Sequence, residues 1–174
     1  MPVIEFASIQ LASPNSLHNE PIPALFERGC TNQSTFSSFP VYIFKDVSDA
    51  SGAYIISGWE DVAQHKLSMD SQTNQEVMGE ILNYMSLKSL VHPKIDFTTF
   101  PEDVSVVVME KYAPGQEEAI VPPAKWVGSG VADEDGQKYK ISVYGAEDAA
   151  SVISSPSVRG KDRIVMQRVM SFKA

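Results

Sequence analysis

The sequence predicts an α+β fold of antiparallel strands in which one structural unit occurs twice. The segment Tyr54-Ile55-Ile56-Ser57-Gly58-Trp59 returns as Tyr139-Lys140-Ile141-Ser142-Val143-Tyr144, and each copy follows a charged turn. Each copy leads into a short helical stretch, and one more apolar strand lies downstream, at 87–97 and at 163–172. Periodicity of this kind indicates an architecture before any single residue does.

The first unit, residues 1–97, is expected to have the order β-α-β-β-α-β. Alternating or continuous apolar runs predict its strands at 3–11, 40–47, 53–59 and 87–97. A helix is expected from Pro23 onward, because proline is well placed in a first helical turn. Two further helices are predicted at 60–67 and 70–85, the second with an apolar stripe at helical spacing and a cap at Asp70 or Ser71.

Residues 98–103 read as a linker, and 104–174 as a second, degenerate copy of the unit. Strands are expected at 104–112, 125–132, 138–144 and 163–173, with a helix at 146–153. The Asp135-Gly136 pair favours a hairpin turn between the middle two strands. The proline-rich segment 114–123 stands where the first helix should be and is expected to be a loop.

Composition excludes several classes of function. The chain has 174 residues and a formal charge of -8, from 14 basic and 22 acidic side chains, so binding to nucleic acid is not expected. One cysteine, Cys30, rules out an intrachain disulfide and a cysteine-based metal cage. No stretch reaches the length of a membrane span, and the start of the chain reads as a strand rather than a leader, so we expect a cytoplasmic location.

The segment Tyr54 to Ser68, which contains Trp59-Glu60-Asp61-Val62-Ala63-Gln64-His65, resembles the dimeric α+β barrel superfamily. It is most similar to the antibiotic-biosynthesis-monooxygenase branch, in which a strand ends in an aromatic residue and the next helix carries a histidine. The resemblance spans roughly the first unit and, in the second, only the hairpin and final strand.

The resemblance implies two ferredoxin-like units whose sheets face one another in a barrel. Here one chain carries both units, so a monomeric pseudo-dimer or a homodimer is expected. The space between the two sheets is the expected pocket, and a hydrophobic small molecule the expected ligand. Haem-degrading members have a histidine near the position of Met69 and an asparagine on the first strand; both are missing here, so no haem is implied.

His65 is the strongest catalytic candidate, because an imidazole exchanges protons near neutral pH. Tyr54 is the second, as a phenol that orients or protonates an enolate. The alternative for each residue is structural and is the more common one: His65 would cap its helix or bridge it to a strand, and Tyr54 would be an amphipathic residue at the edge of the core. The histidines lack metal-ligand spacing, so no metal site is predicted. Candidate substrate-binding residues are the remaining aromatic side chains near the same strand ends and one further histidine: Trp59, Tyr42, Tyr144, Tyr139 and His92.

The sequence therefore favours an enzyme that tailors a hydrophobic, polyketide-like or terpenoid-like metabolite without a bound cofactor. Proton transfer would steer cyclisation, isomerisation or dehydration. The first alternative is cofactor-free oxygenation of a phenol or anthrone. The second is a barrel without catalytic activity that binds a ligand or a partner protein. Neither the substrate nor the reaction type is determined by the residues alone.

Overall fold

One eight-stranded antiparallel sheet forms the frame of the molecule, with strand order β4-β1-β3-β2-β8-β5-β7-β6. The computed structural model describes residues 1–113, 123–155 and 162–173. In the first half of the sheet the strands are β1 (Val3–Leu11), β2 (Val41–Asp46), β3 (Gly52–Trp59) and β4 (Met85–Val91). In the second half they are β5 (Val106–Tyr112), β6 (Trp126–Val131), β7 (Lys138–Tyr144) and β8 (Arg163–Phe172).

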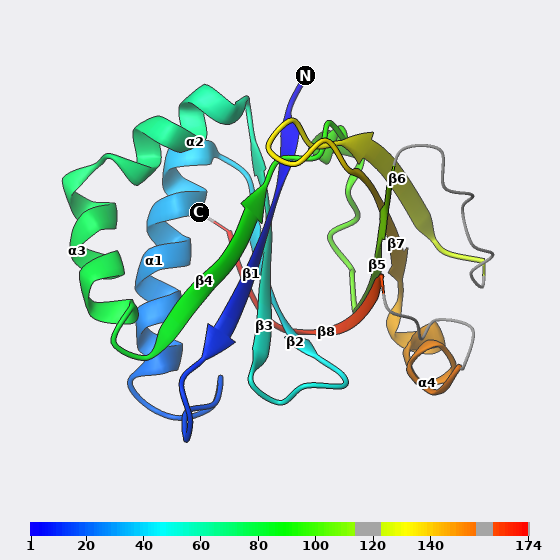
Figure 1. The fold of residues 1–174 in the computed structure, drawn as a ribbon, viewed down its shortest axis with the longest axis horizontal. Coiled ribbons are helices and arrows are strands. Elements are labelled where there is room, and N and C mark those ends of the chain that lie inside the picture. Colours follow the sequence, from blue (N-terminus) through cyan, green and yellow to red (C-terminus); the bar gives the residue numbers. More distant parts are fainter. Residues whose placement is uncertain (114–122, 156–161, 174) are drawn as a thin grey trace.

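The two halves repeat the same strand order, 4-1-3-2, and meet where β2 pairs with β8. This arrangement confirms the predicted α+β fold with tandem ferredoxin-like units. The sheet curls so that its halves face one another, with β8 passing from one to the other (Figure 1). One continuous sheet joins the halves. The division of the chain into a first unit (1–97), a linker (98–103) and a second unit (104–174) therefore stays a prediction.

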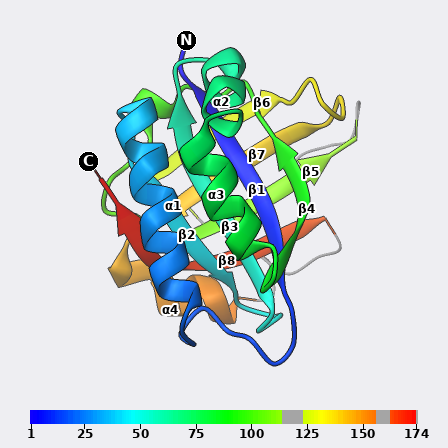
Figure 2. The ribbon, with the colours of Figure 1, turned by 90° about the vertical axis from the view of Figure 1, so that its left-hand side faces the viewer.

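Three helices cover the outer face of the first half: α1 (Ile22–Ser37), α2 (Val62–Met69) and α3 (Gln72–Ile81), as Figure 2 shows. Side-chain caps fix where two of them begin. The Asp61 carboxylate accepts a hydrogen bond from the backbone N–H of Gln64, and the Ser71 hydroxyl accepts one from that of Asn74. The outer face of the second half carries α4 (Ala146–Ser154) (Figure 1).

The expected strand at 87–97 was wrong in its bounds, because β4 begins at Met85 and ends at Val91. The backbone N–H of His92 is used by the Glu134 carboxylate instead of a neighbouring strand, and Pro93 has no N–H to donate. A short 3-10 helix, η1 (Phe97–Thr99), follows. The helix expected at 70–85 is likewise shorter, as α3. The expectation for 114–123 concerns a segment whose residues 114–122 lie outside the described ranges.

The space between the facing halves is filled by side chains rather than open. Phe6 and Tyr54 of the first half stack with ring centroids 5.6 Å apart, and Phe6 reaches Tyr139 of the second half at 6.5 Å. Met166 and Ile141 are fully buried in the same cluster. Burial of so much apolar surface makes this layer the main stabilising core. Among the described residues, packed side chains therefore occupy the region where the pocket between the sheets was expected.

The barrel is closed at one end by a contact between the segment after β4 and the end of β6. Pro93 and Ala132 form an isolated antiparallel bridge, and the N–H of Lys94 donates to the carbonyl of Val131 at 3.1 Å. Gly130 makes this approach possible, since a Cβ there would lie 2.4 Å from the carbonyl oxygen of Lys94. This closure brings the turn after β6 against the first half of the molecule.

Candidate functional site

A cavity of about 320 Å³ lies between the outer face of the first half-sheet and its helices. It is on the opposite side of the sheet from the packed barrel interior. Its lining is mainly aliphatic and thioether side chains from β1, β3, β4 and the three helices. The apolar members are Ala7, Ile9, Leu25, Phe26, Ile55, Met69, Val77, Met78, Ile81, Leu82, Met85, Leu87 and Leu90.

The mouth of this cavity is marked by two apolar residues that both line it and reach solvent. Leu82, which follows α3, and Leu87, on β4, are each about half exposed. β4 is an edge strand of the sheet, so no further strand covers this side. An apolar molecule would therefore enter between the end of α3 and β4.

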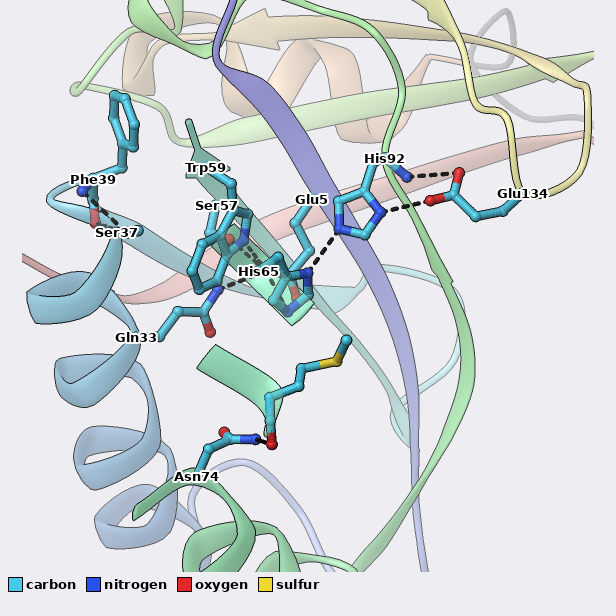
Figure 3. Close-up of polar contacts among 11 residues, drawn as sticks. Glu5, Gln33, Ser37, Phe39, Ser57, Trp59, His65, Asn74, His92 and Glu134 are labelled. Atoms are coloured by element: carbon cyan, nitrogen blue, oxygen red, sulfur yellow. Dashed lines mark hydrogen bonds and ion pairs between the residues drawn. The ribbon is translucent and has the colours of Figure 1, made fainter. Parts of the chain in front are cut away.

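Glu5 is the centre of a buried polar cluster at one wall of the cavity (Figure 3). A single oxygen, Oε2, accepts hydrogen bonds from Gln33 Nε2 at 2.6 Å, Ser57 Oγ at 2.7 Å and Trp59 Nε1 at 2.7 Å. These donors come from α1 and β3. A buried carboxylate is tolerated only when its hydrogen bonds are satisfied, and here three donors converge on it.

His65 of α2 stands beside this cluster and also lines the cavity. Its ring stacks on the indole of Trp59, with centroids 4.3 Å apart and an interplanar angle of 17°. Its Nε2 lies 3.7 Å from Oε2 of Glu5, which is too long for a hydrogen bond but close enough for charge attraction. The imidazole is therefore held by a flat apolar surface on one side and faces an anion at its edge.

The other ring nitrogen of His65 begins a hydrogen-bonded chain that runs away from the cavity (Figure 3). His65 Nδ1 lies 2.7 Å from His92 Nε2, and His92 Nδ1 lies 2.6 Å from Glu134 Oε1. Glu134 belongs to the turn between β6 and β7, in the second half of the molecule. Both imidazoles are buried, whereas the Glu134 side chain is 34% exposed.

The hydrogen-bond partners assign the tautomers of both rings. A carboxylate can only accept, so His92 carries a proton on Nδ1, and a neutral His92 then presents a bare Nε2 to His65. His65 then carries its proton on Nδ1, which leaves Nε2 as a free lone pair near Glu5. Burial lowers the pKa of His65 below its ordinary value of 6.5, outweighing the attraction of Glu5, and His92 adds to the lowering. His65 is thus a neutral base near pH 7.

Three of the residues proposed from the sequence gather here, and four do not. Trp59, His65 and His92 form one connected group. Tyr54 and Tyr139 lie in the barrel core, Tyr42 packs on Phe100 with centroids 5.6 Å apart, and Tyr144 is buried beneath α4. None of these four tyrosines is among the cavity-lining residues. Their roles in substrate binding or catalysis stay predictions.

The two tyrosines of the repeated segment make matching contacts. The Tyr54 hydroxyl donates to Asp46 and the Tyr139 hydroxyl to Asp135, each at 2.7 Å. Burial and the neighbouring carboxylate raise the pKa of Tyr54, and the same two causes raise that of Tyr139 to about 12 although Lys111 opposes them. Neither phenol is suited to lose a proton near neutral pH.

Sequence reasoning missed Glu5, Gln33, Ser57 and Glu134. The sequence does mark Glu5 as unusual, because it falls on the same strand face as the apolar residues Val3, Ala7 and Ile9. A carboxylate in an otherwise apolar, covered strand face needs partners. Gln33 and Ser57 carry no such signal, and Glu134 reads as an ordinary turn residue. The described residues contain no group of three His, Cys, Asp or Glu side chains able to hold a metal ion, and no helix among them could span a membrane.

The fold is shared with solved structures of very different sequence. A Fusobacterium nucleatum protein named "putative monooxygenase" superposes with a TM-score of 0.66 at 11% identity, over 99% of this chain and 94% of that one. A "putative monooxygenase" from Lactobacillus acidophilus gives 0.59 at 13% identity, over 99% and 96%. An "anthrone oxidase-like protein" gives 0.53 at 9% identity, over 97% and 92%.

These similarities establish the fold, and they agree with the dimeric α+β barrel superfamily that the sequence resembles. They do not single out the antibiotic-biosynthesis-monooxygenase branch. No protein-family model matches the chain, and no curated protein matches it.

Proposed function

We propose that the protein is a small-molecule oxidase that removes a proton from an electron-rich phenol or anthrone, whose anion then reacts with dioxygen. The observation that carries the proposal is the position of His65, a buried imidazole at one wall of an apolar cavity whose Nδ1 is engaged by His92 and whose Nε2 is left for a substrate proton. The names of the structural neighbours, two called "putative monooxygenase" and one "anthrone oxidase-like protein", support oxidation over other uses of that base.

The cavity suits a compact aromatic substrate with one polar edge. Its volume lies near the lower end of small-molecule sites, which begin at about 300 Å³. Its aliphatic and methionine lining would bind flat apolar rings. Two polar side chains at its wall would orient the substrate: the Asn74 amide would donate to a carbonyl oxygen, and Gln33 Oε1 would accept from a hydroxyl, since the Gln33 N–H groups bind Glu5 and Ser57. The substrate's acidic hydrogen would then face His65.

Glu5 would stabilise the charge that forms on His65. When Nε2 takes the substrate proton, the ring becomes a cation 3.7 Å from the Glu5 carboxylate. Attraction between opposite charges is strong in a buried site, so the proton transfer becomes less costly. Gln33, Ser57 and Trp59 keep the carboxylate in place before the proton moves. This fixed arrangement needs no reorganisation during the reaction.

The oxidation balances with dioxygen as the only co-reactant. An anthrone-type CH₂ loses one proton to His65, and the carbanion adds O₂ to form a C–O bond. The resulting peroxide anion takes a proton to become a hydroperoxide. Loss of the second C–H proton with cleavage of the O–O bond gives a ketone and water. Overall, CH₂ and O₂ become C=O and H₂O.

Oxygen uptake with anthrone as the probe tests this proposal. We expect the protein to consume oxygen and to form the quinone in equal amounts, and His65→Gln to lose both activities. His18→Gln is the matched control, because His18 is exposed and remote in sequence from the cluster. Conversion of anthrone to the quinone at the protein-free rate would contradict oxidation of this substrate class.

The same experiment under nitrogen separates oxidation from proton transfer alone. In D₂O the protein should exchange the acidic CH₂ hydrogens of anthrone for deuterium, which proton NMR detects. Exchange without oxygen uptake in air would instead favour the isomerisation or cyclisation chemistry expected from the sequence. Absence of both would leave a ligand-binding barrel.

A further inference from the structure

The chain of contacts from His65 leads out of the cavity and into the other half of the molecule. His65 lies on α2, His92 follows β4, and Glu134 lies in the β6–β7 turn. The distances between successive partners are 2.7 and 2.6 Å, both within hydrogen-bond range. Only the last member reaches solvent appreciably. The arrangement is a continuous path from a buried base to the surface (Figure 3).

We propose that His65, His92 and Glu134 form a proton relay that connects the cavity to solvent. This rests on the proposed role of His65 as the base. A proton arriving at Nε2 of His65 releases the one on Nδ1 to Nε2 of His92. The proton on Nδ1 of His92 then passes to Oε1 of Glu134 and on to water. One proton enters the chain, one leaves, and each imidazole changes tautomer. When the peroxide anion takes a proton from Nε2 of His65, the same steps run in reverse and restore the starting tautomers.

Charged groups lie at both ends of the relay. The Glu5 carboxylate faces the cavity end and holds the first cationic ring. At the outer end, partial burial works to raise the pKa of Glu134, but its hydrogen bonds with His92 outweigh burial and lower it. A weakly basic carboxylate passes its proton to water readily. The nearby pair Lys94–Asp133 is exposed and neutral as a whole.

Glu134 also fixes the direction of the relay. Its Oε2 accepts the backbone N–H of His92 at 3.2 Å while Oε1 accepts the ring N–H, so both carboxylate oxygens bind the same residue. These two hydrogen bonds orient the His92 ring and set its tautomer, which in turn sets the tautomer of His65. Glu134 is therefore a positioning residue for a base that it does not touch. The closure at Gly130 and Ala132 is what brings it within reach.

Nitrogen NMR of the histidine rings tests the assignment without any substrate. Above their titration range, both rings should be protonated on Nδ1 and bare on Nε2. Glu134→Ala removes the acceptor, so His92 should move its proton to Nε2 and His65 should follow. Asp133→Ala, in the same turn, should move neither. A wild-type His65 protonated on Nε2, or a His65 tautomer unchanged in folded Glu134→Ala, would overturn the relay.

Glu134→Gln tests transfer itself, because the amide oxygen can still accept the ring N–H of His92, although the NH2 group cannot accept its backbone N–H, and the amide cannot take up a proton at neutral pH. With the path blocked, a proton taken from anthrone returns to the same carbon instead of exchanging with D₂O. Deuterium exchange should then fall at least about tenfold relative to oxidation, a change that a purely structural role would not produce. Asp133→Asn should leave the ratio unchanged.

Equal loss of exchange and oxidation in Glu134→Gln would overturn the relay while leaving His65 as the base. If wild-type protein neither exchanges nor oxidises anthrone, the proposed function fails for this substrate. The tautomer measurement then still decides whether the three residues are coupled. The two failures are therefore distinguishable.

Discussion

The two halves of the sheet share one strand order but differ on their outer faces. In the first half, Glu5 is paired with Ser57 across β1 and β3. At the matching place of the second half, Val108 is paired with Ser142 across β5 and β7. The first half holds a carboxylate with three donors beside a cavity. The second half holds a small apolar cluster of Val106, Val108, Tyr144 and Val152, closed by α4.

This difference teaches that the backbone frame does not require the polar cluster. Ser57 and Ser142 occupy equivalent positions in the repeat, and so do Trp59 and Tyr144. Only the first half has a carboxylate at this matched position together with a buried histidine, whereas the buried carboxylate of the second half, Glu110 on β5, is paired with Arg163 at 2.6 Å. Burying such groups costs stability unless hydrogen bonds offset the lost hydration, and the second half forms the same frame without them at this position. The contrast therefore supports a functional role for Glu5 and His65 and a structural role for the residues that both halves share.

Adding a glutamate at the position of the second half that matches Glu5 should have the largest effect on stability. Val108→Glu would bury a charge against Val152 and Tyr144, and we expect the free energy of unfolding to fall by about 3–5 kcal/mol. Urea denaturation measures this loss. The matched control is Val127→Glu on β6, where the side chain is about half exposed and the change should be within about 0.5 kcal/mol. Equal losses at the two sites would show that position 108 accepts a carboxylate without a paired cation, unlike buried Glu110, which has Arg163.

Removing the base from the first half should have the next largest effect, on turnover. His65→Gln keeps a polar side chain on α2 but cannot accept a proton, so anthrone oxidation should fall by at least about a hundredfold. Steady-state oxygen uptake gives the number, and thermal unfolding shows whether the fold persists. Retention of wild-type turnover in the folded variant would remove His65 from the mechanism.

The paired tyrosines should behave alike if they belong to the shared frame. Tyr54→Phe and Tyr139→Phe each delete one hydrogen bond to a turn aspartate, so each should cost about 1 kcal/mol of unfolding free energy. Neither change should alter anthrone turnover by more than about twofold, because neither residue lines the cavity. A large, selective loss of turnover in Tyr54→Phe would restore the catalytic role that the sequence suggested for it.

The smallest expected effect is a pH dependence of stability that belongs to the first half alone. The pKa of His65 is lower in the folded protein than its ordinary value of 6.5, so the unfolded chain binds more protons below that pH. The stabilisation is fully present above about pH 6.5 and is lost as the pH falls through the folded pKa. Chemical denaturation across this range should show the decline in wild type. His65→Gln should flatten it, whereas a slope unchanged in that variant would assign the effect to another group.

Much of the frame followed from the pattern of residues along the chain. Apolar alternation placed β1 and β7 at their observed bounds, and the repeated segment located matching strands in both halves. The caps at Asp61 and Ser71 are local, since each acts within three residues. The end of β4 was missed because it depends on Glu134, which captures the N–H of His92 from 42 positions away.

The candidate site was only partly accessible in the same way. His65, Trp59 and His92 stood out as residue types that bear chemistry. That Glu5 is their neighbour depends on which strand face the helices cover, and alternation alone does not decide it when both faces are apolar. The location of the cavity depends on how tightly each layer packs. The barrel interior is filled by large aromatic rings, whereas the helices stand off the sheet.

The amino-acid sequence by itself determined the duplicated antiparallel frame, because the alternation of apolar residues in strands, the turn residues and the helix caps all act over a few neighbouring positions. Tertiary structure alone decided which face is hollow and that His65, His92 and Glu134 meet. The reason is that these contacts join α2, the end of β4 and the β6–β7 turn. Only the curl of the whole sheet and its closure at Gly130 bring those elements together.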